Sequence, residues 1–394
     1  MSTSKSRLLG GLLMALAALT FNALAAKPIS IENFAKLPGA GALKVSPGGE
    51  YIALKLQSKG AGKLAILDST KLKPIAAFGV GSKKEGKAVG DVFWVSDERV
   101  IYTTTTSYAW NKQVHRGNNI YAADVDGGKR KIIFGPKAGE QAAGSNKKVR
   151  KADMGNNQII DLLKGDDKHI LVAFYPWSET AVRWFLNQSA KPIVYRVNVY
   201  TGKKKKLGNL YMPLDDGITD NAGVVRFSVG IDKQSNHRIA YKAKADDEWA
   251  LFSINDFVGE KIVPVGFSSD NNSVYLEANV GDGTRAVYLH DFKTQKTTKL
   301  FHDEQVDVSH YVYDFDSSVV VGAGTDKGLP NYECFDKSNR AVKVHRSMMA
   351  TFEGSDIVLT SATKDANTVI IKARSETNAG DYYLFDRKKM GLTI

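Results

Sequence analysis

The chain of 394 residues contains a single cysteine, Cys334, so no disulfide can form within it. We expect this thiol to act as a small buried apolar side chain. The chain has no low-complexity tract, and its one long apolar run, residues 8–19, is short for a membrane span. With 43% hydrophobic and 10% aromatic residues, the composition predicts a folded globular protein with a packed core.

Several catalytic and metal-binding patterns are also missing. No Gly-x-Ser-x-Gly nucleophile elbow occurs, and the nearest approaches, residues 227–230 and 354–356, do not fit the pattern. The seven histidines lie far apart, without helical spacing or cysteine partners that would indicate a metal site. The glycine clusters lack the strand, loop and helix context of a phosphate cradle. We therefore predict no catalytic residue, no metal and no cofactor.

Positive charge is in excess, at a formal +12. The lysines and arginines are scattered, however, and the densest runs, residues 147–150 and 203–206, fall in predicted loops. Solvated turns explain such runs better than a nucleic-acid surface does, so we predict no nucleic-acid partner. A weak affinity for anionic envelope surfaces is the open alternative.

The amino-terminal segment has the pattern of a secretory signal peptide. Lys5 and Arg7 precede the apolar run, and Ala23-Leu24-Ala25 forms a small-x-small cleavage site. We predict cleavage after Ala25 and export, with a periplasmic location and no stable membrane anchor. Residues 26–40 then form an amino-terminal segment ahead of the main domain.

The strongest positive signal is a unit that returns about every fifty residues. It consists of a short apolar strand, a Ser/Asp/Gly turn, a second strand, and a third strand ending in Asp before a polar hairpin. The clearest copy, residues 43–68, reads LKVSPGGEYIAL and then GKLAILD. One small twisted sheet cannot bury both of its faces unless neighbours stack around an axis. The repeat therefore predicts an all-β fold, a β-propeller of four-stranded antiparallel blades.

Seven such units can be followed along residues 41–394. They cover residues 41–80, 91–134, 158–208, 224–263, 265–301, 308–344 and 357–394. Neither terminal unit is short of a strand, so we expect a ring that closes without a shared blade. Alternation in twos dominates, and helix is expected only in the signal segment and at residues 32–35.

The residues carry a family resemblance. The phrase IENFAKLPGAGALKVSPGGEYIAL, the later FWVSDERVIYTTTT and AADVDGG, and the closing YYLFDRKKMGLTI resemble the amino-terminal propeller of the prolyl oligopeptidase family, in its exported bacterial acylaminoacyl-peptidase and dipeptidyl-peptidase branch. The resemblance runs over residues 31–394. SPGG-type turns are similar to those of TolB-like propellers as well.

The resemblance also sets a contrast. In that family the propeller is followed by an α/β-hydrolase domain of about 250 residues that carries the serine nucleophile. This sequence has no counterpart of that domain, so it resembles only the non-catalytic part. Peptide hydrolysis by the family mechanism would then require a partner polypeptide.

Two long insertions are the predicted binding sites. Residues 107–118 and 176–191 are too long for simple hairpins and combine aromatic side chains with arginine. The candidates are Tyr108, Trp110, Arg116, Trp177, Arg183 and Trp184. The competing interpretation is that these aromatics pack between blades or against a missing domain.

Two functions follow. One is a propeller module that gates substrates for a hydrolase domain or partner polypeptide. The other is a stand-alone TolB-like scaffold that binds peptides or envelope proteins. An exposed apolar face would favour the first, whereas a polar face with one concave aromatic pocket would favour the second.

Overall fold

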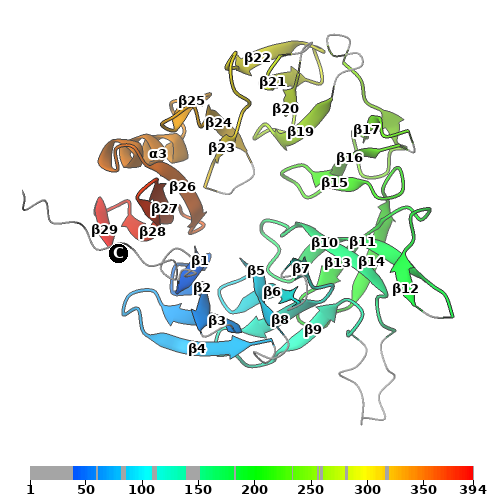
Figure 1. The fold of residues 1–394 in the computed structure, drawn as a ribbon, viewed down its shortest axis with the longest axis horizontal. Coiled ribbons are helices and arrows are strands. Elements are labelled where there is room, and N and C mark those ends of the chain that lie inside the picture. The colour runs from blue at the N-terminus through cyan, green and yellow to red at the C-terminus, as the bar shows by residue number, and fades with distance from the viewer. Residues whose placement is uncertain are drawn as a thin grey trace, which may run out of the picture. The chain divides into compact units, whose positions relative to one another are not determined.

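The computed structural model describes residues 39–393, with the exception of residues 59–60, 81–85, 109–112, 139–150, 182, 233, 255–256, 258–260, 280–282 and 316–318. These residues form seven small antiparallel sheets placed as blades around a central axis (Figure 1). In each blade the first strand lies nearest the axis, and the later strands follow outward. The predicted seven-bladed β-propeller is confirmed. The predicted signal peptide and the predicted helix at residues 32–35 lie outside the described residues.

The first three blades follow the predicted order of strands. Blade 1 contains β1 (Ala40–Val45), β2 (Tyr51–Ser58), β3 (Ala61–Asp68) and β4 (Pro74–Gly79). Blade 2 contains β5 (Lys87–Trp94), β6 (Arg99–Ser107), β8 (Ile120–Asp124) and β9 (Lys131–Phe134), with β7 (Val114–Arg116) paired to β6. Blade 3 contains β10 (Gly155–Asp161), β11 (His169–Glu179), β13 (Ile193–Asn198) and β14 (Lys204–Asn209), with β12 (Trp184–Leu186) paired to β11.

The remaining blades complete the ring. Blade 4 contains β15 (Asp216–Thr219), β16 (Val225–Ile231), β17 (His237–Tyr241) and β18 (Ala250–Leu251). Blade 5 contains β19 (Ile262–Phe267), β20 (Ser273–Ala278), β21 (Ala286–Asp291) and β22 (Thr297–Phe301). Blade 6 contains β23 (His310–Tyr313), β24 (Val320–Thr325) and β25 (Asn331–Cys334), followed by helix α3 (Arg340–Thr351). Blade 7 contains β26 (Asp356–Ala362), β27 (Thr368–Ser375), β28 (Asn378–Asp386) and β29 (Gly391–Thr393).

The turn between the first and second strands of a blade explains the Ser/Asp/Gly element of the repeat. A hydroxyl at the start of the turn accepts a hydrogen bond from the backbone N–H five residues later. Ser46 accepts from residue 51 at 3.2 Å, Ser268 from residue 273 at 2.9 Å, and Thr363 from residue 368 at 3.1 Å. Such a bond satisfies a backbone donor that the sheet leaves unpaired. We call the side of the disc that carries these turns the turn face.

Apolar packing joins each blade to the next. One buried cluster spans blades 1 and 2, and others follow in turn around the ring to blades 7 and 1. Between blades 4 and 5, for example, Phe227 packs with Phe267 at a ring distance of 5.6 Å. At about 25 cal/mol per Å² of apolar surface, these seams supply the main stabilisation of the disc.

Over residues 39–393, as far as they are described, blades 1 and 7 meet without exchanging a strand, as predicted. Side chains and turns join them instead. The Val45 N–H donates to the Ser361 hydroxyl at 2.9 Å, the Ala42 N–H donates to the Tyr382 hydroxyl at 3.0 Å, and the Lys364 N–H donates to the carbonyl of residue 47 at 2.8 Å. We call this junction the closing seam.

Two expectations about the elements are wrong. Residues 340–344 were expected to end a strand of the sixth unit, but they begin helix α3, which covers blade 6 where a fourth strand was predicted. Asn339 caps the helix, and Ala341, Val344 and Met348 are buried at helical spacing. The short alternation in AVKV imitates a strand, whereas the longer stretch has a period near 3.6.

The boundary between the fourth and fifth units also differs. Val263 lies in β19, the inner strand of blade 5, and the inner strand of blade 4 is β15, ahead of the predicted start at residue 224. Residues 216–219, with the sequence DGIT, are too short and too polar to stand out by alternation.

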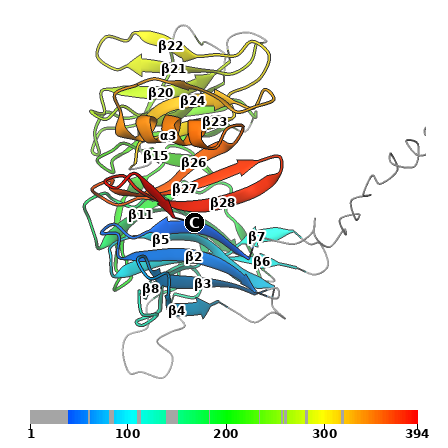
Figure 2. The ribbon, with the colours of Figure 1, turned by 90° about the vertical axis from the view of Figure 1, so that its left-hand side faces the viewer.

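The two insertions extend strands at the side of the disc opposite the turn face. Figure 2 shows β6 and β7 projecting beyond the body of the disc. β12 pairs with the far end of β11 in the same way, through residues 177–179. We call this side the hairpin face.

Candidate functional site

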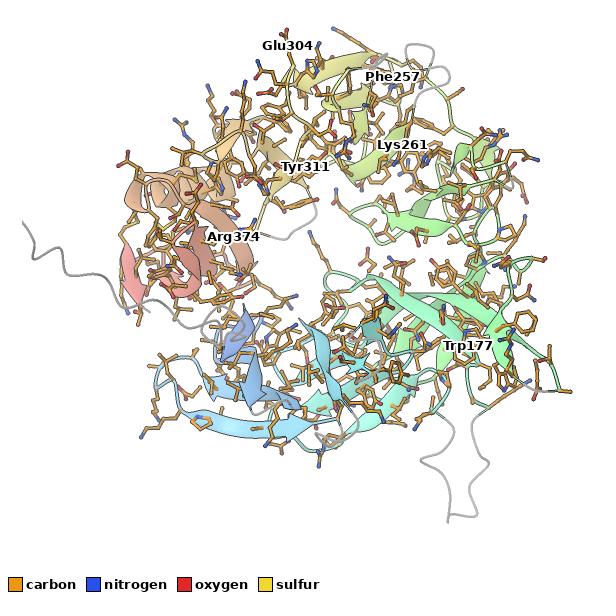
Figure 3. The ribbon with its side chains drawn as sticks, in the orientation of Figure 1. Trp177, Phe257, Lys261, Glu304, Tyr311 and Arg374 are labelled. Atoms are coloured by element: carbon orange, nitrogen blue, oxygen red, sulfur yellow. The ribbon has the colours of Figure 1, made fainter. Side chains whose placement is uncertain are left out.

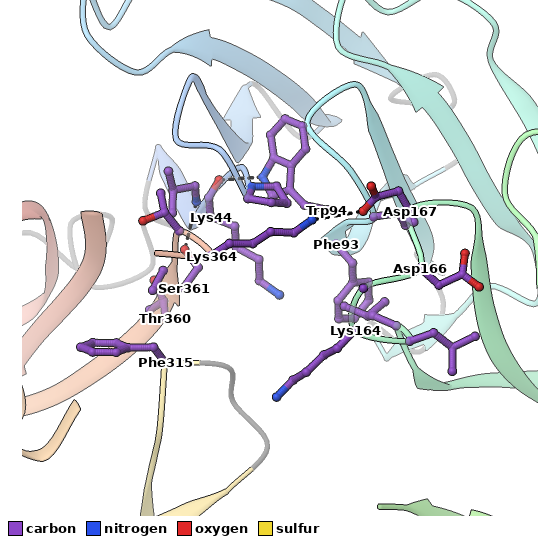
Figure 4. A pocket seen from close by; sticks show the side chains of 18 residues that line it. Lys44, Phe93, Trp94, Lys164, Asp166, Asp167, Phe315, Thr360, Ser361 and Lys364 are labelled. Carbon is purple, nitrogen blue, oxygen red and sulfur yellow. Dashed lines mark hydrogen bonds and ion pairs between the residues drawn. The ribbon is translucent and has the colours of Figure 1, made fainter. Parts of the chain in front are cut away.

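The central axis opens on the turn face through a pocket of about 320 Å³ that we call the mouth (Figure 4). Five blades contribute to its wall, because the ends of their inner strands converge there. The lining residues include Lys44, Phe93, Lys164, Phe315, Ser361 and Lys364. A pocket of this size is at the lower end of the range for small-molecule sites.

Lys44 is positioned by the junction of blades 1 and 2. Its backbone carbonyl accepts a hydrogen bond from the Trp94 indole N–H at 2.9 Å, and its ammonium lies 4.4 Å from the centre of the Phe93 ring. Burial lowers the pKa of Lys44; Asp91 opposes this effect and Lys55 adds to it. Within the described part of the chain, no carboxylate forms an ion pair with Lys44.

Lys364 and Asp167 form an ion pair across the mouth, at 3.3 Å between Nζ and Oδ1. Lys364 comes from the blade 7 turn and Asp167 from the blade 3 turn, so their contact spans the opening in front of blades 1 and 2 (Figure 4). The two side chains are 64% and 54% exposed. An exposed pair of this kind contributes about 0–1 kcal/mol to stability.

Asp166, next to this pair, is neutralised on its own blade. Partial burial raises its pKa, but hydrogen bonds from Arg196 and His169 lower it to about 2. His169 Nδ1 lies 3.0 Å from Asp166 Oδ2. The negative charge of Asp166 is therefore already compensated.

A second pocket, of about 530 Å³, lies along the axis and shares Phe93 and Lys164 with the mouth. Blades 2 to 6 line it, with Gln158, Asp220 and Tyr313 among its walls. Asp220 is held by Arg226 in a buried pair at 3.0 Å. Both pockets thus combine apolar walls with a few polar groups, and together they receive side chains from all seven blades.

The predicted binding residues that the structure describes lie away from the mouth. Tyr108 follows β6 and is 46% exposed, and its ring contacts that of His115 in a tilted arrangement with the ring centres 5.4 Å apart. Arg116 ends β7 and donates from Nη1 to the carbonyl of Asn157 at 2.9 Å. Trp110 is outside the described residues. Neither Tyr108 nor Arg116 lines the mouth.

The second insertion divides its candidates. Trp177 is half-buried in β11, and its indole N–H donates to Asn156 Oδ1 at 3.0 Å; Figure 3 shows it within blade 3, away from the axis. Arg183 is exposed in the hairpin, where its carbonyl accepts from the Thr180 N–H at 3.0 Å. Trp184 is 41% exposed and lines a separate pocket beside Lys204.

The structure therefore brings Arg116 and Trp177 together around β10, where each bonds to one of two adjacent asparagines. It does not gather the five described candidates into one pocket. Their role in binding stays a prediction.

Sequence reasoning missed Lys44, Phe93 and Lys164. Each lies within three residues of a predicted turn, at the end of a strand or just beyond it. The sequence signal that could have found them is their position at the end of an inner strand, and no motif marks them. The first strand of every blade faces the axis, so its last residues reach the opening.

Among the described residues, no group of three or more His, Cys, Asp or Glu side chains is placed to hold a metal ion. In the same part of the chain, no helix has the length and apolar character needed to cross a bilayer.

No sequence-family profile matches the chain, and no curated protein matches it. Solved structures do. A prolyl endopeptidase structure aligns with 90% of this chain at 11% identity and a TM-score of 0.52, and this chain spans about half (49%) of its length. A puromycin-hydrolysing peptidase from Mycobacterium tuberculosis aligns at 10% identity and a TM-score of 0.49, covering 89% of this chain and 52% of its own. An oligogalacturonate lyase in complex with manganese aligns at 12% identity and a TM-score of 0.48, covering 86% and 87%. At such identities the first match indicates the fold alone.

Proposed function

We propose that this chain is a non-catalytic propeller module that binds peptides at its mouth and controls their passage along the axis. The observation that carries the proposal is the mouth itself, where an ammonium group and an aromatic ring meet in a pocket open to solvent. Apolar walls with a few placed polar groups are typical of ligand sites.

The likeness to peptidase propellers supports a role in peptide handling. The prolyl endopeptidase whose propeller has this fold is described as using inter-domain dynamics in catalysis and specificity. By analogy, the propeller selects which peptides reach a catalytic centre. Because one fold hosts many functions, peptide binding at the mouth is the direct test of this role.

The experiment is a binding titration of the purified chain with short peptides, followed by mass spectrometry of the same peptides. We expect saturable binding and intact peptides, because the sequence has no Gly-x-Ser-x-Gly nucleophile elbow. Lys364→Trp, which places an indole across the mouth, should weaken binding. Binding that this variant leaves unchanged, or cleavage of the peptides, would contradict the proposal.

A second role is support of a hydrolase domain or partner polypeptide at the hairpin face. Four large apolar side chains there are exposed, namely Tyr108 at 46%, Val114 at 69%, Trp184 at 41% and Phe185 at 45%. Exposed apolar groups on projecting hairpins favour contact with another protein surface over isolation in water. This observation favours the peptidase-module proposal over a TolB-like scaffold.

The mass of the native species tests this second role. A native complex heavier than the chain, dissociated by Val114→Glu together with Phe185→Glu, would support it. A monomer with the mass of the mature chain alone would argue for the stand-alone scaffold.

We also propose that the protein is exported and is cleaved after Ala25, on the basis of the amino-terminal pattern. The intact mass of the protein from the periplasmic fraction should correspond to a chain that begins at Ala26. Retention in the cytoplasm at full length would contradict export.

A further inference from the structure

Lys44 is the one lysine at the mouth that combines partial burial with an aromatic contact. Three other charged groups at the mouth are paired within the protein: Lys364 with Asp167, and Asp166 with Arg196 and His169. Lys44 has only the Phe93 ring beneath it, at 4.4 Å, and no ion pair in the described part of the chain. Figure 4 shows the Lys44 and Lys164 side chains both reaching toward the opening.

A partly buried ammonium without a carboxylate partner costs stability, because burial favours its neutral form. A ligand that brings one negative charge into the mouth would remove this cost. Ser361 provides a further polar group: its hydroxyl oxygen accepts from the Val45 N–H at 2.9 Å, and no described hydrogen bond uses its own O–H. The O–H can therefore donate to a ligand oxygen.

The balance of charges at the mouth selects a monoanion. Asp91 acts electrostatically on Lys44, whereas Asp166 and Asp167 are paired with Arg196 and Lys364. A ligand with two or more negative charges would be repelled by Asp91, and this repulsion would offset part of its attraction to the lysines. A carboxylate fits this balance better than a phosphate does.

The apolar wall of the mouth indicates that the ligand carries an apolar group next to its negative charge. Val45, Leu162, Leu163 and Phe93 line the pocket beside Lys44. A carboxyl-terminal peptide residue with an apolar side chain presents a carboxylate and an apolar group a few bonds apart. We propose that the mouth recognises the free carboxyl terminus of a peptide, with Lys44 holding the carboxylate and Phe93 supporting both.

This inference rests on the proposed peptide binding, and one experiment separates the two. Di- to tetrapeptides that end in Phe or Leu are prepared as free acids and as carboxyl-terminal amides. Each is titrated calorimetrically into the purified chain. The acid should bind at least about tenfold more tightly than the amide, as expected for one charged hydrogen bond.

The variants assign this preference to Lys44. Lys44→Gln should remove the difference between acid and amide, and Lys44→Arg should keep most of it. Lys73→Gln is the matched control, since Lys73 is an exposed lysine at the β3–β4 turn that does not line the mouth. It should leave the difference unchanged. Acetate should compete with the acids, and inorganic phosphate at equal concentration should compete no better.

A second readout does not depend on affinity. After reductive methylation with ¹³C, the Lys44 resonance can be identified by its absence in Lys44→Gln. Binding of a carboxylate should move its titration to higher pH, whereas the amide should not.

The outcomes are distinct. Acid and amide that bind equally would overturn carboxylate recognition and leave peptide binding in place. Failure of both forms to bind would overturn both proposals. A preference for the acid that persists in Lys44→Gln would also reject the assignment to this residue.

Discussion

At the scale of single residues, Lys44 lowers the stability of the free protein but provides a charge that a ligand can use. Its ammonium is partly buried over an aromatic ring, without an ion-pair partner among the described residues. A cation–π contact contributes about 0.5–1 kcal/mol at partly exposed sites and only partly offsets desolvation. A side chain that costs stability in the free protein is better explained by its ligand than by the fold.

This conflict predicts that Lys44→Met stabilises the protein at pH 7, by about 0.5–1 kcal/mol in the free energy of unfolding. The Lys44 pKa in the folded protein lies below its unfolded value of 10.5. The cost of the charged form is thus fully present at neutral pH and disappears as pH rises through the folded pKa toward 10.5. Urea denaturation at pH 7, 9 and 10.5 should show that the difference in the free energy of unfolding between Lys44→Met and wild type becomes smaller as pH rises. A gap independent of pH would contradict this origin.

The buried ring of His345 is expected to make the stability of the protein sensitive to acid. Its ring is buried under blade 6, with Nε2 3.1 Å from the Ile357 carbonyl and the ring 4.7 Å from Tyr332. Burial lowers its pKa, while the Ile357 carbonyl and Asp356 oppose the shift. The stability that neutral His345 contributes is therefore fully present above pH 6.5, and it is lost as pH falls through the lowered pKa of the folded protein.

The measurement is the free energy of unfolding of wild type and His345→Gln at pH 8 and at pH 5. Wild type should lose more stability than the variant between the two, since glutamine does not titrate. Equal losses would exclude His345 as a source of the acid sensitivity.

At the scale of elements, the repeat can be recognised in the sequence wherever a turn contains a side chain that bonds to the backbone of the same turn. Ser46, Ser268 and Thr363 bond to their own turns, and that local pattern made blades 1, 5 and 7 predictable. The β15–β16 turn is marked by Asp220, whose Oδ1 accepts from the N–H groups of residues 222 and 224, but β15 itself is too short and too polar to stand out by alternation. Helix α3 was missed because its four-residue start alternates like a strand.

The candidate site was less predictable than the fold. The turn repeat predicts where the axis must be, but not which side chains reach it. Lys44 and Lys164 are close only because blades 1 and 3 sit around the same opening, and 119 intervening residues separate them in the sequence. The aromatic insertions were conspicuous in sequence yet extend at the hairpin face, away from the mouth.

Helix α3 offers a prediction about its cap. Asn339 accepts a hydrogen bond from the Ala341 N–H at 2.8 Å, which satisfies one of the free donors at the start of the helix. Asn339→Ala should lower the free energy of unfolding by about 1 kcal/mol, and Asn339→Asp should restore most of it. Chemical denaturation of the three proteins tests this, and equal midpoints would show that the cap is not needed.

At the scale of the whole molecule, the closing seam is the place where the ring depends on side chains. The buried Val45 N–H donates to Ser361 across it, and the described strands include none that is shared between blades 1 and 7. Ser361→Ala should leave this donor without a partner and cost about 1–3 kcal/mol. Exposed Ser189 in blade 3 provides the matched control, and Ser189→Ala should have little effect.

Hydrogen exchange locates the loss. In Ser361→Ala, protection should fall first in β1 and β26, while β20 and β21 on the opposite side of the ring keep theirs. Uniform loss of protection would mean that the ring opens as one cooperative unit and that the seam is not its weak point.

Because each sheet is built from one uninterrupted stretch of chain, a single in-frame duplication or deletion can add or remove a complete blade. In a ring fastened by a borrowed strand, the blade that holds both ends could not be exchanged in this way. Here any blade is a transferable unit, and the new neighbours have only to match apolar surfaces. The arrangement lets such a gene vary the diameter of its central opening, and hence the size of what enters it, by whole segments.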